Sequence, residues 1–308
     1  MIALWHIDSN TSVLRNEKEA PAKHQIFKSK YSMISTGTER LIARGQVDSS
    51  FHDVMKVPYQ SGDFDFPIKY GYSLIVENKN GDIGHIMHPH QDEIDVNQEA
   101  ITWATEELPP FRFALISNME TILNAIWDSR LKGDEAIAIC GFGNIGALLA
   151  NTLRIYKGIE ATIFENNAWR REKAISLGWS VETEGLYDIL FHTTATEGGL
   201  QFCLEHLNYE GKLVELSWYG SQRVNIELGK DFHYKRLMLI SSQVSNIPGH
   251  MKMFHTYESR KKLAFDILKD DSFDALITNK IPFRDAPAFF ERLRTGDVEE
   301  GLIYLIEY

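Results

Sequence analysis

A glycine-rich segment between two apolar stretches carries the strongest chemical signal in the sequence. Its glycines, Gly141, Gly143 and Gly146, have the spacing G-x-G-x-x-G and enclose Asn144 and Ile145. In such a segment the first glycine allows a tight turn, the second leaves room for a pyrophosphate, and the third lets the next helix pack close to a strand. The first turn of that helix presents unpaired N–H groups to phosphate. The segment therefore predicts a dinucleotide-binding site.

An acidic residue stands where such a site needs one. Glu165 closes the second apolar stretch, at about the 20-residue distance typical of the dinucleotide motif. A carboxylate there accepts hydrogen bonds from the ribose hydroxyls of NAD and repels the 2′-phosphate of NADP. Asn166 and Asn167 follow it, rather than a basic residue. We therefore expect NAD(H) as the cofactor, with NADP(H) less favoured.

The elements that position these residues are predicted from periodicity. Residues 136–140 form an apolar run typical of a strand buried on both faces, and 161–164 form a second such run. Between them, residues 145–156 have the apolar spacing of a helix. Strand, glycine turn, helix, strand and acid thus occur in the order that the motif requires. Arg170 and Arg171 could flank the nucleotide, but we expect them on the solvated face of the next helix.

Strands and helices continue to alternate after Glu165, which predicts an α/β fold with a parallel, doubly wound sheet. The expected elements are helices at 113–130, 170–177 and 198–206 and strands at 188–193, 212–217 and 237–242. Short, closely spaced strands near the N-terminus, among them 70–77, predict a small barrel or folded sheet. We expect a β-rich domain over residues 1–118, a nucleotide-binding domain over 119–245 and a C-terminal segment, 246–308, that packs back on the first domain.

Polar residues follow the later strands of the predicted sheet. Ligands bind at the carboxyl ends of parallel strands. Thr193, Thr194 and Ser217 are therefore expected to contact the cofactor, with Ser217 and Trp218 beside the nicotinamide. An ordinary turn at the strand ends is the alternative interpretation.

Composition excludes several classes of function. The net charge of −11 argues against nucleic acid as a partner, because phosphate contacts need a basic face. No apolar run approaches the roughly 18 to 20 residues of a membrane span, and the N-terminus does not have the pattern of a secretory signal. The only cysteines, Cys140 and Cys203, exclude a disulfide framework and a four-cysteine zinc site. A cytoplasmic protein with a small-molecule substrate is expected.

Over its whole length the chain resembles the medium-chain dehydrogenase/reductase superfamily of alcohol dehydrogenase-like enzymes. The resemblance implies a GroES-like β-rich catalytic lobe, a Rossmann domain and a C-terminal return to the first lobe. The segments STGTE (35–39), FPIKYGY (66–72), HPHQ (88–91) and SSQV (241–244) are most similar to a zinc-less branch that includes bacteriochlorophyllide a dehydrogenase-like proteins. A likeness of fold does not carry a substrate.

The positions where zinc-dependent members of the family hold their metal carry hydroxyl groups here. The resemblance matches the family motif C-G-T-D with a segment that runs from Thr36 to Glu39 and G-H-E with the segment that contains Tyr72 and Ser73. It matches a helix cysteine with Ser117. Protein zinc sites use thiolate, imidazole or carboxylate ligands. The resemblance and these departures from it together predict that the protein has no catalytic zinc.

A second group of possible metal ligands lies in a loop. His88 and His90 form an H-x-H pair, with Asp92 and Glu93 nearby. On a strand such a pair places both rings on one side. No third ligand stands at a typical spacing, so local hydrogen bonding by both histidines is the favoured interpretation.

Without a metal, hydrogen-bond donors must polarise a substrate carbonyl. By the resemblance, Thr38 occupies the position that passes the proton in zinc-dependent members. We expect Tyr72 to donate to the substrate oxygen once its surroundings lower the pKa of the phenol, with Thr36, Thr38 or Ser117 assisting. A packed core tyrosine is the alternative. Glu39 is expected to orient neighbouring groups.

The function that these residues predict is a zinc-independent, NAD(H)-dependent oxidoreductase. It would transfer hydride to or from a small alcohol or carbonyl compound or an activated alkene. A non-catalytic NAD-binding sensor or scaffold is the alternative. An apolar segment at 237–240 is a candidate edge strand for a homodimer, although core burial would account for it equally well.

Overall fold

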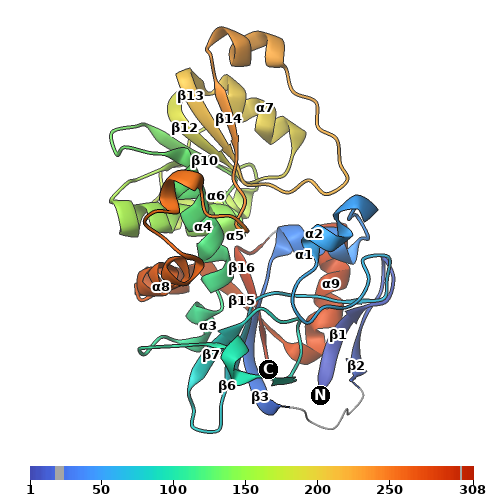
Figure 1. Ribbon diagram of the computed structural model, residues 1–308. Coiled ribbons are helices and arrows are strands. Elements are labelled where there is room, and N and C mark those ends of the chain that lie inside the picture. The colour runs from blue at the N-terminus through green and yellow to red at the C-terminus, as the bar shows by residue number, and fades with distance from the viewer. Residues whose placement is uncertain (18–23, 299) are drawn as a thin grey trace. The chain divides into compact units, whose positions relative to one another are not determined.

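The computed structural model describes residues 1–17, 24–298 and 300–308 in two compact units (Figure 1). The first unit contains Met1–Ser117, Ile277–Val298 and Ile303–Tyr308, and the second contains Asn118–Leu276 with a short segment that ends at Leu302. The structure thus divides the predicted C-terminal segment, because residues 246–276 belong to the second unit. Within the described ranges, no helix is both long and apolar enough to cross a membrane.

A parallel sheet forms the centre of the second unit. Its strands lie in the order β11-β10-β12-β13-β14, and each pairs in parallel with its neighbour. A further parallel bridge joins Ile163 of β11 to Val181. The strands are β10 (Ile137–Cys140), β11 (Thr162–Phe164), β12 (Tyr187–His192), β13 (Leu207–Glu215) and β14 (Met238–Ser241). The strand order reverses between β10 and β12, which confirms the predicted doubly wound fold and marks where such sheets bind ligands.

Helices connect these strands, as a parallel sheet requires. The connecting helices are α5 (Asn144–Thr152), α6 (Ala168–Ser176) and α7 (Glu197–Glu205), whereas α4 (Ile116–Ser129) precedes β10 and α8 (Tyr257–Ile267) follows β14. Every residue of β10 is buried, in keeping with its apolar sequence. Helix α7 packs on β12 and β13 (Figure 1). It buries Leu200, Cys203 and Leu204 there, and both cysteines of the chain are buried and free.

The strands of the first unit pair antiparallel, except that β15 and β16 pair with each other in parallel. One sheet has the order β2-β1-β5-β4, and the other has the order β15-β16-β3-β6-β7-β9, with β8 paired to β3. The strands are β1 (Ile2–His6), β2 (Ser12–Asn16), β3 (Gln25–Ile34), β4 (Ser61–Gly62), β5 (Ile68–Lys69), β6 (Leu74–Glu77), β7 (Ile83–Ile86), β8 (Glu93–Val96), β9 (Thr102–Trp103), β15 (Ile277–Pro282) and β16 (Ile303–Glu307). The helices are α1 (Thr36–Ala43), α2 (His52–Met55), α3 (Pro110–Phe113) and α9 (Ala286–Thr295).

The end of the chain completes the sheet of the first unit. β16 pairs antiparallel with β3, with Tyr304 opposite Ile34. Helix α9 buries Phe289, Phe290 and Leu293 in the same apolar cluster. Residues from both ends of the sequence therefore share one core.

Two predicted elements differ from the structure. The predicted strand 70–77 begins only at Leu74, because Gly71 has a φ of +138°, which interrupts the extended backbone. The predicted helix 113–130 is divided into α3, which ends at Phe113, and α4, which begins at Ile116.

Candidate functional site

The glycine turn after β10 has the geometry that its sequence predicts. Gly141 has a φ of +101°, and a Cβ at this position would lie 2.7 Å from Oγ1 of Thr193. At Gly146 a Cβ would lie 1.9 Å from the carbonyl oxygen of Gly141. A side chain at Gly146 would therefore force α5 away from β10, and only glycine permits this close approach.

The first turn of α5 offers donors to an anion. Gly143 is its N-cap residue, and the atoms nearest to a Cβ there would belong to the Arg170 guanidinium, at 3.5 Å. Asn144 is buried, and its Oδ1 accepts a hydrogen bond of 3.2 Å from Nδ2 of Asn118. Among the described residues, Nδ2 of Asn144 has no partner. Ile145 is half-buried beside it. A buried amide donor without a partner at a helix N-terminus fits a phosphate of NAD(P).

Glu165 is held firmly at the end of β11. Its Oε2 accepts a hydrogen bond of 2.7 Å from the N–H of Phe142, and its Oε1 accepts one of 2.8 Å from the N–H of Asn167. The Asn167 side chain in turn caps α6. The carboxylate is therefore fixed beside the glycine turn, as the ribose-binding acid of a dinucleotide site must be.

Arg170 and Arg171 differ from the solvated side chains that we expected. Both are half-buried. Nε of Arg170 donates to the carbonyl oxygen of Gly301 at 3.2 Å, and Nη1 of Arg171 donates to the carbonyl oxygen of Glu165 at 3.2 Å. The Arg170 guanidinium thus adds positive charge next to Gly143, where a pyrophosphate would lie.

The predicted residues at the strand ends meet at one edge of the sheet. Oγ1 of Thr193 donates to the carbonyl oxygens of Cys140 and Gly141, at 3.0 and 3.1 Å. Oγ of Ser217 accepts a hydrogen bond of 3.0 Å from the N–H of Ala195. The ends of β10, β12 and β13 are therefore connected by side chains beside the glycine turn.

A polar network that the sequence did not predict lies next to this edge. Nδ1 of His192 lies 2.7 Å from Oε2 of Glu215, and its Nε2 lies 2.7 Å from Oγ1 of Thr194. The Tyr219 hydroxyl donates to Oε2 of Glu215 at 3.0 Å, and the N–H of Ser217 donates to Oε1 at 2.6 Å. Burial, followed by the Glu215 charge, raises the pKa of Tyr219. The sequence carried no signal for this pair, because β12 and β13 contain other charged residues, among them Asp188 and Lys212.

The predicted catalytic residues belong to the first unit, where two of them meet. The Tyr72 phenol hydrogen-bonds the side chains of Ser35 and Thr38 at the start of α1. Burial raises the pKa of the phenol, the charge of Glu39 raises it further, and the two hydrogen bonds act in the opposite direction. Our expectation of a lowered pKa is therefore wrong. The phenol stays protonated, so it can donate a hydrogen bond.

The other two predicted catalytic residues lie differently. Oγ of Ser117 donates to the carbonyl oxygen of Tyr72 at 3.2 Å and lies 3.1 Å from Nε2 of His85. It therefore contacts the backbone of Tyr72 rather than being grouped with the phenol. Thr36 is the first residue of α1 and is half-buried.

The donor groups at the positions matched with zinc ligands decide whether a catalytic zinc could bind here. The matched positions provide the hydroxyls of Thr36, Tyr72, Ser73 and Ser117, and that of Ser73 donates to the carbonyl oxygen of Ala114 at 2.7 Å. Zinc in proteins takes thiolate, imidazole or carboxylate ligands. Within the described part of the chain, no group of three His, Cys, Asp or Glu side chains is arranged to hold a metal ion. These donors do not fit zinc.

The two loop histidines have separate partners. Nδ1 of His88 lies 2.9 Å from the carbonyl oxygen of Pro89, which confirms local hydrogen bonding for this residue. His90 instead contacts distant residues, because its Nε2 lies 2.8 Å from Oε2 of Glu39 and its Nδ1 lies 2.7 Å from Oγ of Ser32. The local interpretation is therefore wrong for His90.

No family model matches the sequence. (R,R)-butanediol dehydrogenase of Bacillus subtilis is 23% identical over 215 residues, which cover 61% of this chain and 60% of that enzyme. The matched part thus spans less than two thirds of the relative.

Solved structures match the chain along its whole length. The crystal structure of 2R,3R-butanediol dehydrogenase from Bacillus subtilis superposes with a TM-score of 0.74 at 18% identity and covers 100% of this chain and 99% of that one. The fold is that of the medium-chain dehydrogenase/reductase superfamily. A short chain alcohol dehydrogenase from Escherichia coli CFT073, in complex with NADH, also has a TM-score of 0.74, at 12% identity, over 100% of this chain and 99% of that one.

A third solved structure with this fold contains NADPH instead of NADH. TarJ of S. aureus, in complex with NADPH, has a TM-score of 0.67 at 14% identity and covers 99% of this chain and 98% of that one. Proteins with this fold therefore occur in complex with either NADH or NADPH.

Proposed function

We propose that the protein is an NAD(H)-dependent oxidoreductase that acts on a small alcohol or carbonyl compound or an activated alkene without catalytic zinc. The main support for the proposal is the glycine turn after β10 together with the fixed carboxylate of Glu165. Gly146 packs against Gly141, Nδ2 of Asn144 is a buried donor without a partner in the described chain, and Glu165 is oriented by two backbone N–H groups. NAD(H) would accept or supply the hydride.

Each group of the second unit has a role in this proposal. The N-terminus of α5, the Asn144 amide and the Arg170 guanidinium would bind the pyrophosphate. Glu165 would accept hydrogen bonds from the adenosine ribose and disfavour a 2′-phosphate, so we propose a preference for NAD(H) over NADP(H). The network around His192 would hold Thr194 and Ser217 in place at the carboxyl edge of the sheet.

The proton donor in this proposal is Tyr72. Its phenol is held by Ser35 and Thr38 and remains protonated, because burial raises its pKa. A protonated phenol can donate a hydrogen bond to a carbonyl oxygen and stabilise the charge that develops on it. Zinc independence is supported by the hydroxyl donors at the matched positions.

The experiment that tests the function has two steps. Binding of NADH and of NADPH is measured first, by titration calorimetry. Oxidation of NADH is then followed at 340 nm with a panel of aldehydes, ketones and enones, before and after treatment with a strong chelator. We expect NADH to bind more tightly, at least one substrate class to turn over, and the rate to survive chelation. Loss of the rate on chelation, restored by zinc, would exclude the zinc-independent mechanism.

Two observations favour a second candidate function, a non-catalytic NAD-binding sensor or scaffold. The raised pKa of Tyr72 makes the phenol a weaker acid, and the Ser117 hydroxyl is engaged with His85 and the Tyr72 backbone. The same experiment separates the two functions. A sensor would bind NADH and leave it unoxidised with every member of the panel.

We also propose a homodimer that forms through β14. Met238 and Leu239 of this strand are each 42% exposed, so core burial does not account for its apolar sequence. β14 is the last strand of the sheet order, and an exposed apolar edge strand favours pairing with another chain.

A further inference from the structure

The loop that follows β14, residues 242–246, contains no helix or strand, yet side chains of α4 and α8 donate to four of its carbonyl oxygens in succession. The hydrogen bonds are, in chain order, from Nδ2 of Asn124 to Gln243 (2.9 Å), from Nη1 of Arg260 to Val244 (2.7 Å), from the hydroxyl of Tyr257 to Ser245 (2.9 Å) and from Nδ2 of Asn124 to Asn246 (2.7 Å). The path of this loop is therefore fixed by the two helices.

The amide of Asn124 has no hydrogen-bonding group left over. Its Oδ1 accepts a hydrogen bond of 2.7 Å from Nη1 of Arg260, and its two N–H groups donate to the loop. A guanidinium only donates hydrogen bonds, so Oδ1 must face Arg260 and Nδ2 must face the loop. The chemistry of its partners thus decides which way this amide points.

Glu120 completes the group. Its Oε1 lies 3.2 Å from both Nε and Nη2 of Arg260. Glu120, Asn124 and Arg260 are 9%, 0% and 4% exposed, and we call these three residues the loop clamp. A buried ion pair adds little to stability, because the cost of removing both charges from water offsets their attraction. Stability alone therefore gives little reason for a polar group in this place.

The loop begins at the edge of the sheet where the cofactor is proposed to bind. The N–H of Ser242 donates to the carbonyl oxygen of Glu215 at 2.9 Å, and Oε1 of Glu215 accepts from the N–H of Ser217. The carboxyl ends of β13 and β14 are therefore joined, and the loop starts close to a residue that we expect beside the nicotinamide.

The strand order indicates which half of the cofactor the loop borders. In the proposed function Glu165, at the end of β11, accepts the adenosine ribose, and the turn after β10 accepts the pyrophosphate. The order is β11-β10-β12-β13-β14, and neighbouring strands lie about 4.8 Å apart. The other half of the dinucleotide must continue away from β11, along the ends of β12 and β13 towards β14. The loop after β14 therefore borders the nicotinamide half.

We propose that Asn124 and Arg260 are positioning residues for the nicotinamide half of the cofactor. The inference rests on the proposed function and adds to it the residues that shape this side of the site. The clamp acts through the loop, which it holds in one conformation before the cofactor arrives. A loop that became ordered only on binding would weaken the affinity, because fixing its backbone costs free energy.

A comparison of two ligands separates this role from a general effect on the fold. ADP-ribose has the adenosine, the pyrophosphate and the second ribose of NADH but lacks the nicotinamide ring. It contacts the glycine turn and Glu165 as NADH does. Damage to the whole unit would weaken both ligands alike, whereas a misplaced loop would weaken NADH alone.

Two variants disturb the clamp while keeping its size. Asn124→Asp keeps the shape of the side chain and an oxygen for Arg260, but it turns an oxygen instead of two N–H groups towards the loop carbonyls. Arg260→Lys keeps the positive charge beside Glu120 but loses the planar set of donors.

Matched controls make the same substitutions elsewhere in the second unit. Asn151→Asp changes a buried asparagine of α5 whose Nδ2 donates to Oγ of Ser272 at 2.8 Å. Arg154→Lys changes an arginine whose Nε donates to Glu160 at 2.7 Å. Neither residue contacts the loop.

The first arm of the test is calorimetric titration with NADH and with ADP-ribose. In Asn124→Asp and Arg260→Lys we expect the affinity for NADH to fall roughly tenfold or more and that for ADP-ribose to stay within about twofold of the wild type. Both controls should keep both affinities within about twofold. An unchanged affinity for NADH in the two clamp variants, or an equal fall for both ligands, would overturn the inference. So would the same selective loss in the controls.

The second arm needs no nucleotide, so it separates failure of the clamp from failure of the proposed function. Hydrogen–deuterium exchange is measured on the nucleotide-free protein. We expect the amides of residues 243–246 to exchange faster in Asn124→Asp than in the wild type and to be unaffected in Asn151→Asp. Unchanged exchange in Asn124→Asp would overturn the inference whatever the protein binds. If exchange responds as expected and the wild type binds neither ligand, the dinucleotide site itself has failed, and the positioning role fails with it.

Discussion

The N–H of Phe142 donates a hydrogen bond of 2.7 Å to Oε2 of Glu165. This bond joins the glycine turn after β10 to the acid that ends β11. Since the other carboxylate oxygen accepts from the N–H of Asn167, the acid cannot turn away without releasing two backbone donors. The turn and the acid therefore act as one binding element.

Replacing the acid tests its part in cofactor choice. In Glu165→Gln we expect the affinity for NADH to fall roughly tenfold or more, because a charge-assisted hydrogen bond to the ribose is worth about 1.5 to 3 kcal/mol. The affinity for NADPH should fall less or rise, because the repulsion of the 2′-phosphate is removed. Calorimetric titration with both nucleotides measures the ratio. An unchanged ratio of the NADH and NADPH affinities would show that Glu165 does not determine the choice of cofactor.

The close approach of α5 to β10 gives a prediction with an internal control. In Gly146→Ala the new Cβ would meet the Gly141 carbonyl oxygen at 1.9 Å, so we expect unfolding in urea to show a loss of about 1 to 3 kcal/mol and NADH binding to disappear. Gly198→Ala on α7 meets no atom within 4 Å and should change stability by no more than about 1 kcal/mol. Equal behaviour of the two variants would contradict the packing argument.

The Tyr72 hydroxyl can be removed without changing the shape of the ring. In Tyr72→Phe we expect kcat to fall roughly 10²-fold while the affinity for NADH stays that of the wild type. Tyr70→Phe is the matched control, because Tyr70 is a buried neighbour whose ring lies 6.3 Å from that of Tyr72. Steady-state kinetics with the best substrate of the panel measures both variants. Full kcat in Tyr72→Phe would remove the phenol from the mechanism.

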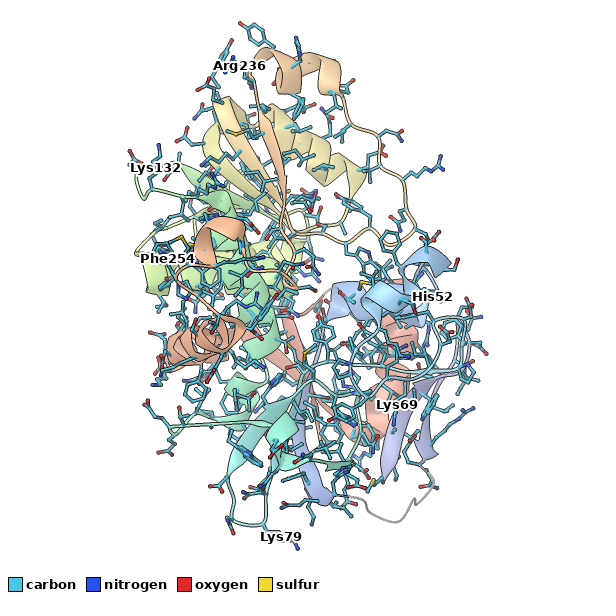
Figure 2. The ribbon with its side chains drawn as sticks, viewed as in Figure 1. His52, Lys69, Lys79, Lys132, Arg236 and Phe254 are labelled. Atoms are coloured by element: carbon cyan, nitrogen blue, oxygen red, sulfur yellow. The ribbon has the colours of Figure 1, made fainter. Side chains whose placement is uncertain are left out.

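His88 links the stability of the first unit to pH. Burial lowers its pKa from 6.5 to about 4, with a smaller contribution from Lys69 (labelled in Figure 2), while the hydrogen bond to Pro89 acts in the opposite direction. The unfolded chain therefore binds a proton at a higher pH than the folded one. This contribution to stability is full above pH 6.5 and is lost as the pH falls towards 4, and the loss reaches about 2 kcal/mol at pH 5.

The variant His88→Gln isolates the contribution of His88 to the pH dependence of the free energy of unfolding. In His88→Gln the free energy of unfolding should fall by about 2 kcal/mol less between pH 7.5 and pH 5 than in the wild type, whatever the variant's stability at pH 7.5. His24→Gln is the control, because the His24 side chain is 49% exposed. Urea titrations at the two pH values measure the difference. Identical pH dependence in His88→Gln and the wild type would show that His88 is not held neutral by burial.

The exposed edge of β14 predicts the oligomeric state. A charge on this strand should oppose pairing, so we expect Leu239→Lys to be a monomer and the wild type a dimer in light-scattering measurements. Ile175→Lys on α6, where the native side chain is 58% exposed, should remain a dimer. A Leu239→Lys protein that is still a dimer would place the interface elsewhere.

Much of the second unit could be predicted from the sequence because its signals are local. The apolar run that forms β10, the glycine spacing and the acid at position 165 each depend on residues close in the chain. The strand ends at Thr193 and Ser217 follow from the topology that these elements imply. Side-chain pairs across strands, such as His192 with Glu215, gave no signal because neither residue is unusual by itself.

The first unit was harder to predict because its contacts are distant in the chain. His90 had only a local interpretation in the sequence, whereas its partners are 51 and 58 residues away, at Glu39 and Ser32. The direction of the Tyr72 pKa shift depends on burial, which no spacing rule provides. Gly71 interrupts the predicted strand through its φ of +138°, and a Cβ there would lie 3.2 Å from Nε2 of His90, a distant residue in the sequence.

Direct calorimetric titration of the protein with NADH tests the central claim. We expect one NADH per chain, a Kd within the range of roughly 1 µM to 1 mM that is usual for enzyme substrates, and weaker binding of NADPH. The absence of binding by either nucleotide, in protein whose folding has been verified, would contradict the assignment of the glycine turn and with it the proposed function.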